Sequence, residues 1–154
     1  MASDKSYTIT LSNNRTEKAA IDYLMSTDES FLNPSASSRK RILQLLDVPS
    51  GYARAYDLIQ VPGHISSDEE ITLSDAGLIT LVELKTTRKR LPECPRGFFF
   101  GATENEFELA RLLGERYKFC FVCLHADTPG FSLVTEAELQ ALIRTKRTQY
   151  QINL

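Results

Sequence analysis

The sequence lacks the features that mark disulfide-rich, membrane-spanning and secreted proteins. Its three cysteines are an odd number and too few for a disulfide scaffold. No apolar run approaches the roughly 20 residues that a membrane-spanning helix needs, and the first residues lack the apolar core of a signal peptide. No internal repeat or low-complexity tract divides the 154 residues. We therefore expect one cytoplasmic domain, residues 1–154, with no membrane as partner.

An excess of charge of one sign is also missing, because 20 acidic and 18 basic residues leave a net charge of −2. This balance does not indicate that the surface as a whole binds nucleic acid. One local basic cluster, Arg88-Lys89-Arg90, directly follows an apolar segment that contains charged residues. Its position makes these three side chains candidate contacts to a phosphate backbone, and a solvated surface run is the alternative.

Helical and strand patterns alternate along the chain. Helices are expected over residues 15–25 (capped by Asn13 or Asn14), 35–46, 104–114 and 136–143, the last two opened by capping boxes at Thr103-Glu-Asn-Glu106 and Thr135-Glu-Ala-Glu138. Strands are expected over residues 7–11, 70–73, 78–87, 98–100, 117–125 and 150–154, with a hairpin turn at 74–77. This order predicts an α/β or α+β fold, in which helices flank a central sheet.

The strand expected at residues 78–87 contains two charged residues, Glu83 and Lys85, in an otherwise apolar run. Residues two apart on a strand share a face, and charged groups seldom face a core unless they are paired or bind a metal. Asp57 is a second acid in an apolar stretch, and neighbouring strands could bring it to the Glu83 face. The alternative for Glu83 and Lys85 is an ion pair on a solvated face.

Two converging acids and a lysine suit the hydrolysis of a phosphodiester. Asp57 and Glu83 could hold Mg²⁺ or Mn²⁺ through oxygen atoms, with the backbone carbonyl of Leu84 as an additional ligand. Lys85 could orient the attacking water and offset the charge that grows on phosphorus.

These residues and the order of elements resemble the PD-(D/E)XK nuclease superfamily and, within it, the NO VEIN C-terminal-type domain. The resemblance covers about residues 15–125 and leaves residues 131–154 as a helical and strand tail. It rests on Ala55-Tyr-Asp57, Val82-Glu-Leu-Lys-Thr-Thr87, Thr103-Glu-Asn-Glu106 and Tyr117-Lys-Phe119, with Tyr56 where the superfamily pattern has proline. It implies a restriction endonuclease-like mixed sheet, Asp57 and Glu83 as metal ligands, and Lys85 as the catalytic lysine.

The resemblance also implies further acids near the site. Glu17 is the candidate on the first helix, and Glu104 and Glu106 are candidates on the helix after the lysine strand. Acids at helix starts are also favoured by the helix dipole alone, which is the alternative for all three. The long separation between Asp57 and Glu83 leaves Asp75 as a rival first acid.

The sequence therefore predicts a Mg²⁺-dependent endonuclease, a hydrolase that acts on DNA in restriction, repair or defence. It would act alone, as a homodimer or with partner subunits of a larger system. The alternative is an inactive restriction-like fold that serves as a nucleic-acid-binding or protein-interaction module. The small size, the mildly acidic charge and the lack of a recognisable DNA-reading element favour that alternative.

Overall fold

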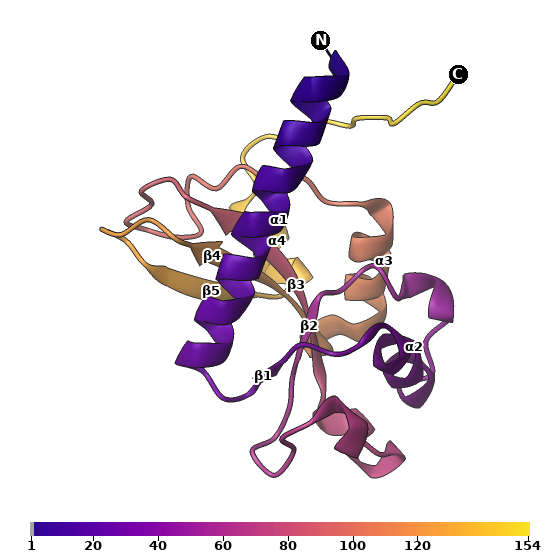
Figure 1. The fold of residues 1–154 in the computed structure, drawn as a ribbon. Helices are drawn as coiled ribbons and strands as arrows, with labels where there is room; N and C mark the ends of the chain where they lie inside the picture. Colours follow the sequence, from indigo (N-terminus) through magenta and orange to yellow (C-terminus); the bar gives the residue numbers. More distant parts are fainter. Residues whose placement is uncertain (1) are drawn as a thin grey trace.

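A five-stranded mixed sheet forms the centre of the computed structural model, which describes residues 2–154 and their side chains from Arg15 onward (Figure 1). The strands lie in sequence order, β1-β2-β3-β4-β5, with β3 and β4 parallel and the other neighbours antiparallel. The helices and strands are α1 (Ala2–Thr27), β1 (Phe31–Leu32), α2 (Ala36–Leu45), β2 (Leu58–Gln60), β3 (Thr80–Thr87), α3 (Glu104–Leu113), β4 (Tyr117–Cys123), β5 (Gly130–Val134) and α4 (Glu136–Leu142). This is a mixed α+β fold, so the predicted class is confirmed.

Helices cover both faces of the sheet (Figure 1). On one face, α1 buries Ala20 and Leu24 against side chains of β2, β3 and β4. On the other face, α2, α3 and α4 contribute to a larger core that includes Tyr117, Phe119 and Phe121 of β4. The sheet is therefore the middle layer between α1 and the three other helices.

The pleat of β3 sends successive side chains to these two layers. Val82 and Leu84 lie in the core under α1, whereas Leu81 lies in the core under the other helices. Glu83 and Lys85 share the face of Leu81 and point toward the α3 side. Glu83 and Lys85 therefore share one face of β3, as the sequence predicts. Helix α3 covers that face.

The connection from β3 to β4 determines which residues lie next to the carboxyl end of β3. Parallel strands need a crossover connection, and here residues 88–103 form a loop that leads into α3. Helix α3 therefore begins near the carboxyl end of β3 and runs back along the sheet (Figure 1). This brings the first turn of α3 next to Lys85.

Three predicted helices and two predicted strands are confirmed. Helix α2 is capped by Ser35, and α3 and α4 open with the two expected capping boxes, centred on Thr103 and Thr135. Strands β3 and β4 lie within the residues expected for them. In each case the local pattern of caps and apolar residues agrees with the tertiary packing.

Residues 15–25 are helical as predicted, but the strand and the helix cap predicted before them are wrong. Residues 7–11 belong to α1 rather than to a strand, and Asn13 and Asn14 lie inside the helix instead of capping it. A strand gains hydrogen bonds only from a neighbouring strand, whereas a helix adds one bond with each residue it incorporates. The helix therefore continues through a segment whose residue pattern alternates.

The strand at residues 70–73 and the hairpin turn at 74–77 are also wrong. The chain forms two 3₁₀ helices there, Asp68–Glu70 and Leu73–Leu78. A capping box joins Thr72 and Asp75, whose carboxylate accepts from the Thr72 amide at 2.8 Å. Such local bonds between side chains and backbone compete with a strand ladder, and β3 pairs with β2 instead.

The two remaining strand predictions fail, and the observed strands β1, β2 and β5 are absent from the predicted set. Residues 98–100 and 150–154 form no strand, and neither has a partner in the sheet. Strand β1 is only two residues long, and β5 is mostly half-buried, so both give weak patterns. Because Val134 and Leu139 belong to the core, the segment from residue 131 completes the sheet and its helical cover.

Within residues 2–154, no helix combines the length and the apolar character that crossing a bilayer requires.

Candidate active site

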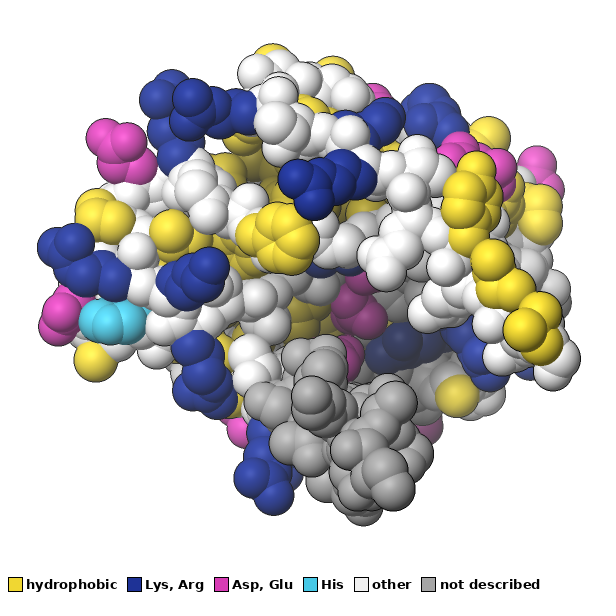
Figure 2. All heavy atoms as spheres, turned by 90° about the horizontal axis from the view of Figure 1, so that it is seen from above, with side chains coloured by type: hydrophobic (Ala, Val, Ile, Leu, Met, Phe, Trp, Pro, Cys, Tyr) yellow, Lys and Arg dark blue, Asp and Glu magenta, His cyan; other side chains and the backbone are white. Residues whose placement is uncertain are grey.

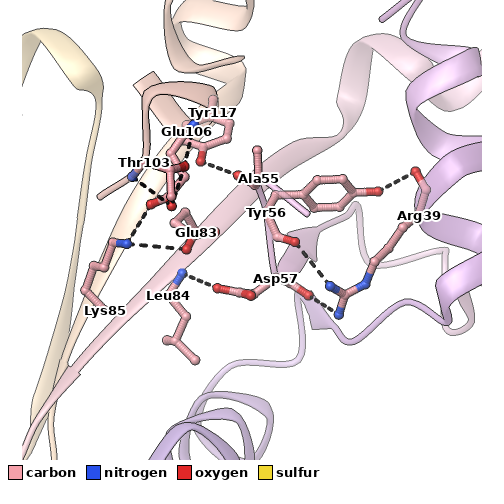
Figure 3. A network of polar contacts seen from close by, with 10 residues as sticks. All are labelled: Arg39, Ala55, Tyr56, Asp57, Glu83, Leu84, Lys85, Thr103, Glu106 and Tyr117. Carbon is pink, nitrogen blue, oxygen red and sulfur yellow. Dashed lines mark hydrogen bonds and ion pairs between the residues drawn. The ribbon is translucent and has the colours of Figure 1, made fainter. Parts of the chain in front are cut away.

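Asp57 and Leu84 meet where β2 begins beside β3. The Asp57 amide donates to the Val82 carbonyl at 2.9 Å, and the Asp57 carboxylate accepts from the Leu84 amide at 2.8 Å (Figure 3). The carboxylate thus takes the place of the strand neighbour that Leu84 lacks. Since the N–H and C=O of a strand residue point to the same side, the Leu84 carbonyl also faces the Asp57 side of β3.

Glu83 is a buried acid next to this corner. Its side chain is 10% exposed, and its Oε2 is buried without a hydrogen-bond partner among the described residues. Burial, and after it the charge of Asp57, raise the pKa of Glu83 from 4.5 to about 9. Burial also raises the pKa of Asp57. Two carboxyl groups therefore share one poorly solvated corner in which neither charge is fully compensated.

Lys85 is held on the other side of Glu83. Its ammonium lies 3.4 Å from Glu83 Oε1 and 2.6 Å from Glu106 Oε1, and its side chain is 10% exposed. The ring of Phe100 lies 5.9 Å from the same nitrogen, within the range of a cation–π contact. The lysine is therefore fixed by two carboxylates and one aromatic face.

The two carboxylate oxygens of Glu106 bind different partners. Oε2 accepts from the amide and the hydroxyl of Thr103, at 3.1 and 2.8 Å, which closes the capping box of α3. Oε1 accepts a hydrogen bond from the Lys85 ammonium (Figure 3). The cap thereby fixes the carboxylate that positions the lysine.

Arg39 clamps the backbone that carries Asp57, a role that the sequence interpretation missed. Its guanidinium donates to the carbonyls of Tyr56 and Asp57 at 3.2 and 3.0 Å, and the Tyr56 hydroxyl donates back to the Arg39 carbonyl at 2.7 Å (Figure 3). The sequence contains a signal for the inward position of Arg39. This residue precedes Ile42 and Leu43 by three and four residues and so shares their buried helix face.

Substituting Arg39 by alanine is expected to lower the free energy of unfolding by about 2–3 kcal/mol. Two backbone carbonyls lose a charged donor, and each such bond contributes about 1.5–3 kcal/mol before relaxation. Urea unfolding measures the difference, with Lys40→Ala as the control because Lys40 is an exposed cation on the same helix. Equal stabilities of the two variants would show that the clamp does not hold the Asp57 segment.

The other acids predicted for the site divide into two groups. Glu17 on α1 lies close enough for the charge of Asp57 to contribute, after partial burial, to its raised pKa. Asp75 caps the 3₁₀ helix before β3 and lies 3.4 Å from His64. Glu104 pairs with Arg111 at 3.2 Å on the exposed side of α3. The structure thus brings Glu17 and Glu106 toward the site and engages Asp75 and Glu104 elsewhere.

The predicted nucleic-acid contacts Arg88, Lys89 and Arg90 are exposed on the loop after β3. Arg88 donates to the Thr16 hydroxyl at 3.3 Å, and Arg90 lies 4.0 Å from Asp127. Figure 2 views this end of the molecule, with Lys and Arg side chains distributed around a hollow in which acidic side chains lie deeper. Exposed cations on the loop after β3 can contact a phosphate backbone.

The donors at this corner fit a hard divalent cation. The described side chains include no group of three His, Cys, Asp or Glu residues arranged to hold a metal ion. Mg²⁺, however, is usually bound by one or two carboxylates and keeps several waters. Glu83 Oε2, which has no hydrogen-bond partner among the described residues, supplies an oxygen ligand together with the facing Asp57 carboxylate and the Leu84 carbonyl.

Comparison of the chain with family models, curated proteins and solved structures finds no match. The resemblance to the PD-(D/E)XK superfamily therefore stays a prediction.

Proposed function

We propose that the chain is a metal-dependent nuclease with a restriction endonuclease-like fold, which hydrolyses phosphodiester bonds of DNA and uses Mg²⁺ or Mn²⁺. The observation that supports this most is the buried acid Glu83, which the half-buried Asp57 faces, beside a lysine that is held in place. A solvated ion pair, the alternative for Glu83 and Lys85, would not be nine-tenths buried. Buried groups of this kind cluster at functional sites because burial is costly for stability.

Each residue has a distinct role in the proposed reaction. Asp57, Glu83 and the Leu84 carbonyl hold the cation. When bound, a divalent cation neutralises the nonbridging phosphate oxygens and makes its water more acidic. Lys85 orients the attacking water and offsets negative charge as it grows on the phosphorus oxygens. Glu106 is a positioning residue, because it acts on the substrate only through Lys85.

The cationic loop supplies the contact to DNA in this proposal. Arg88, Lys89 and Arg90 are exposed directly after the strand that carries Glu83 and Lys85. Their charges attract the backbone and do not read its sequence. The affinity for DNA should therefore fall steeply as salt is added.

A second candidate is an inactive restriction-like fold that binds nucleic acid or protein without cutting. The observation in its favour is the 2.6 Å ion pair between Lys85 and Glu106, which occupies the ammonium without any substrate. An active lysine has to share its donors with water or phosphate. Binding of metal and DNA without cleavage would select this candidate.

Substituting Asp57 by asparagine is expected to reduce nicking of supercoiled plasmid in Mg²⁺ by at least about a thousandfold. The change removes one of two anionic metal ligands, and a bound cation contributes several kcal/mol to the stabilisation of the transition state. The matched control is Asp75→Asn, which changes the rival first acid. Its only expected effect is the loss of a cap at the 3₁₀ helix, about 1 kcal/mol of stability.

Equal loss of nicking in both variants would count against the assignment of Asp57. If the wild type binds Mn²⁺ and DNA but nicks nothing, the inactive module is the better account.

A further inference from the structure

Phe99 is an aromatic residue that the fold holds out in the solvent. It is 90% exposed, whereas its neighbours Phe98 and Phe100 both pack edge-on against Phe121, with ring centroids 4.9 and 5.0 Å apart. Neighbouring side chains in an extended segment point to opposite sides. Anchoring residues 98 and 100 inward therefore fixes residue 99 outward.

The loop before Phe99 is itself held in shape. The Phe98 amide donates to the Pro95 carbonyl at 3.0 Å, and Gly97 turns the chain with a φ of 84°. A positive φ of this kind favours glycine over other residues. An apolar side chain stabilises a fold when it is buried, so the exposed ring of Phe99 contributes no such stability.

The surroundings of Phe99 are cationic and lie next to the proposed site. Residues 88–103 contain four basic residues and one acid, Glu93, so 4 − 1 gives a net charge of +3 in a chain whose total is −2. All five charged residues are exposed. The adjacent residue, Phe100, lies over the Lys85 ammonium.

We propose that Phe99 stacks on an unpaired base of the nucleic-acid substrate, next to the phosphate that Lys85 faces. An exposed aromatic ring beside a cationic track is the arrangement by which proteins bind single strands, because every base offers a π face. In a duplex those faces are already stacked on neighbouring base pairs. The inference rests on the proposed function and adds a substrate class: DNA with a single-stranded segment at the cleavage point.

The test measures binding without cleavage. A fluorescein-labelled 12-nucleotide oligo(dT) is titrated with protein in EDTA, and anisotropy gives the Kd. Phe99→Ala should weaken binding by about 5- to 150-fold, the range found when one stacked base loses its aromatic partner. Leu73→Ala is the control, because Leu73 is 71% exposed on the 3₁₀ helix before β3.

An abasic oligonucleotide of the same length separates stacking from charge. Phe99→Ala should not alter the Kd for this backbone, whereas the triple variant Arg88→Ala/Lys89→Ala/Arg90→Ala should weaken both ligands. Equal weakening of dT and abasic binding by Phe99→Ala would overturn the inference, and so would failure of the wild type to bind oligo(dT).

A fluorescence readout tests the contact directly. The chain contains no tryptophan, so Phe99→Trp introduces a single indole at the proposed stacking position. Its emission should be quenched by oligo(dT) and not by the abasic strand. Absence of quenching by bound oligo(dT) would overturn the inference.

The outcomes also separate this inference from the proposed function. Base-dependent binding without cleavage in Mg²⁺ would support stacking and contradict the nuclease. Cleavage that Phe99→Ala leaves unchanged, on both single-stranded and duplex DNA, would support the nuclease and contradict stacking.

Discussion

Substituting Lys85 by methionine is expected to reduce DNA cleavage by at least about a hundredfold and to destabilise the protein by about 3–5 kcal/mol. The loss of rate follows because a positioned charge that acts on the transition state is removed. The loss of stability follows because Glu106, 2.6 Å from the ammonium and 7% exposed, is left as an unpaired buried carboxylate. Plasmid nicking and urea unfolding measure the two effects.

A double variant separates the two effects of this substitution. Lys85→Met/Glu106→Gln removes the buried charge together with its partner, and glutamine can still close the capping box with Thr103. Most of the lost stability should return, while cleavage should stay at the level of Lys85→Met. Recovery of cleavage with stability would show that the lysine supports the fold and has no part in the reaction.

Substituting Glu83 by glutamine is expected to remove metal binding and to stabilise the metal-free protein at alkaline pH. The buried Oε2 has no hydrogen-bond partner among the side chains that the structure describes, and burial first and then the Asp57 charge raise the pKa of Glu83 to about 9. A neutral amide of the same shape avoids the cost of the buried charge. Loss of function with a gain in stability is typical of residues that serve a site rather than the fold.

The pH dependence of stability follows from the same group. Between the ordinary pKa of 4.5 and about 9, the folded metal-free protein binds a proton at Glu83 that the unfolded chain has released. Stability must then fall as pH rises through this window, by at most about 1.4 kcal/mol per pH unit. The raised pKa of Asp57 acts in the same direction.

Urea unfolding in EDTA from pH 5 to pH 9 measures this slope. Glu83→Gln should flatten it, whereas Glu104→Gln should leave it unchanged, because the Glu104 side chain is 76% exposed. A wild-type slope that Glu83→Gln does not alter would show that the Glu83 corner is not the source of the dependence.

The parts of the site that the sequence predicted are those set by local rules. Alternation along β3 placed Glu83 and Lys85 on one face, and the capping box at Thr103 located the first turn of α3. Two-residue and four-residue periodicities need no knowledge of the rest of the chain. They also identified Asp57 as an acid within an apolar stretch.

The parts that the sequence did not predict depend on long-range pairing. Asp57 reaches Leu84 because β2 pairs with β3, whereas the sequence pattern suggested a hairpin partner for β3 at residues 70–73. The capping bond between Thr72 and Asp75 outcompeted that strand locally. The local helix pattern places Arg39 on the inward face of α2, but its bonds to carbonyls 17 and 18 residues away depend on the tertiary fold.

The central claim is that Asp57 and Glu83 hold one divalent cation between them, and calorimetric titration with Mn²⁺ tests it most directly. Mn²⁺ takes the same oxygen ligands as Mg²⁺ and does not depend on turnover. The account predicts one Mn²⁺ bound per wild-type chain, no measurable binding to Asp57→Asn or Glu83→Gln, and unchanged binding to Asp75→Asn. A folded wild type that binds no Mn²⁺, or Asp57→Asn and Glu83→Gln variants that bind it as tightly as the wild type, would contradict the account.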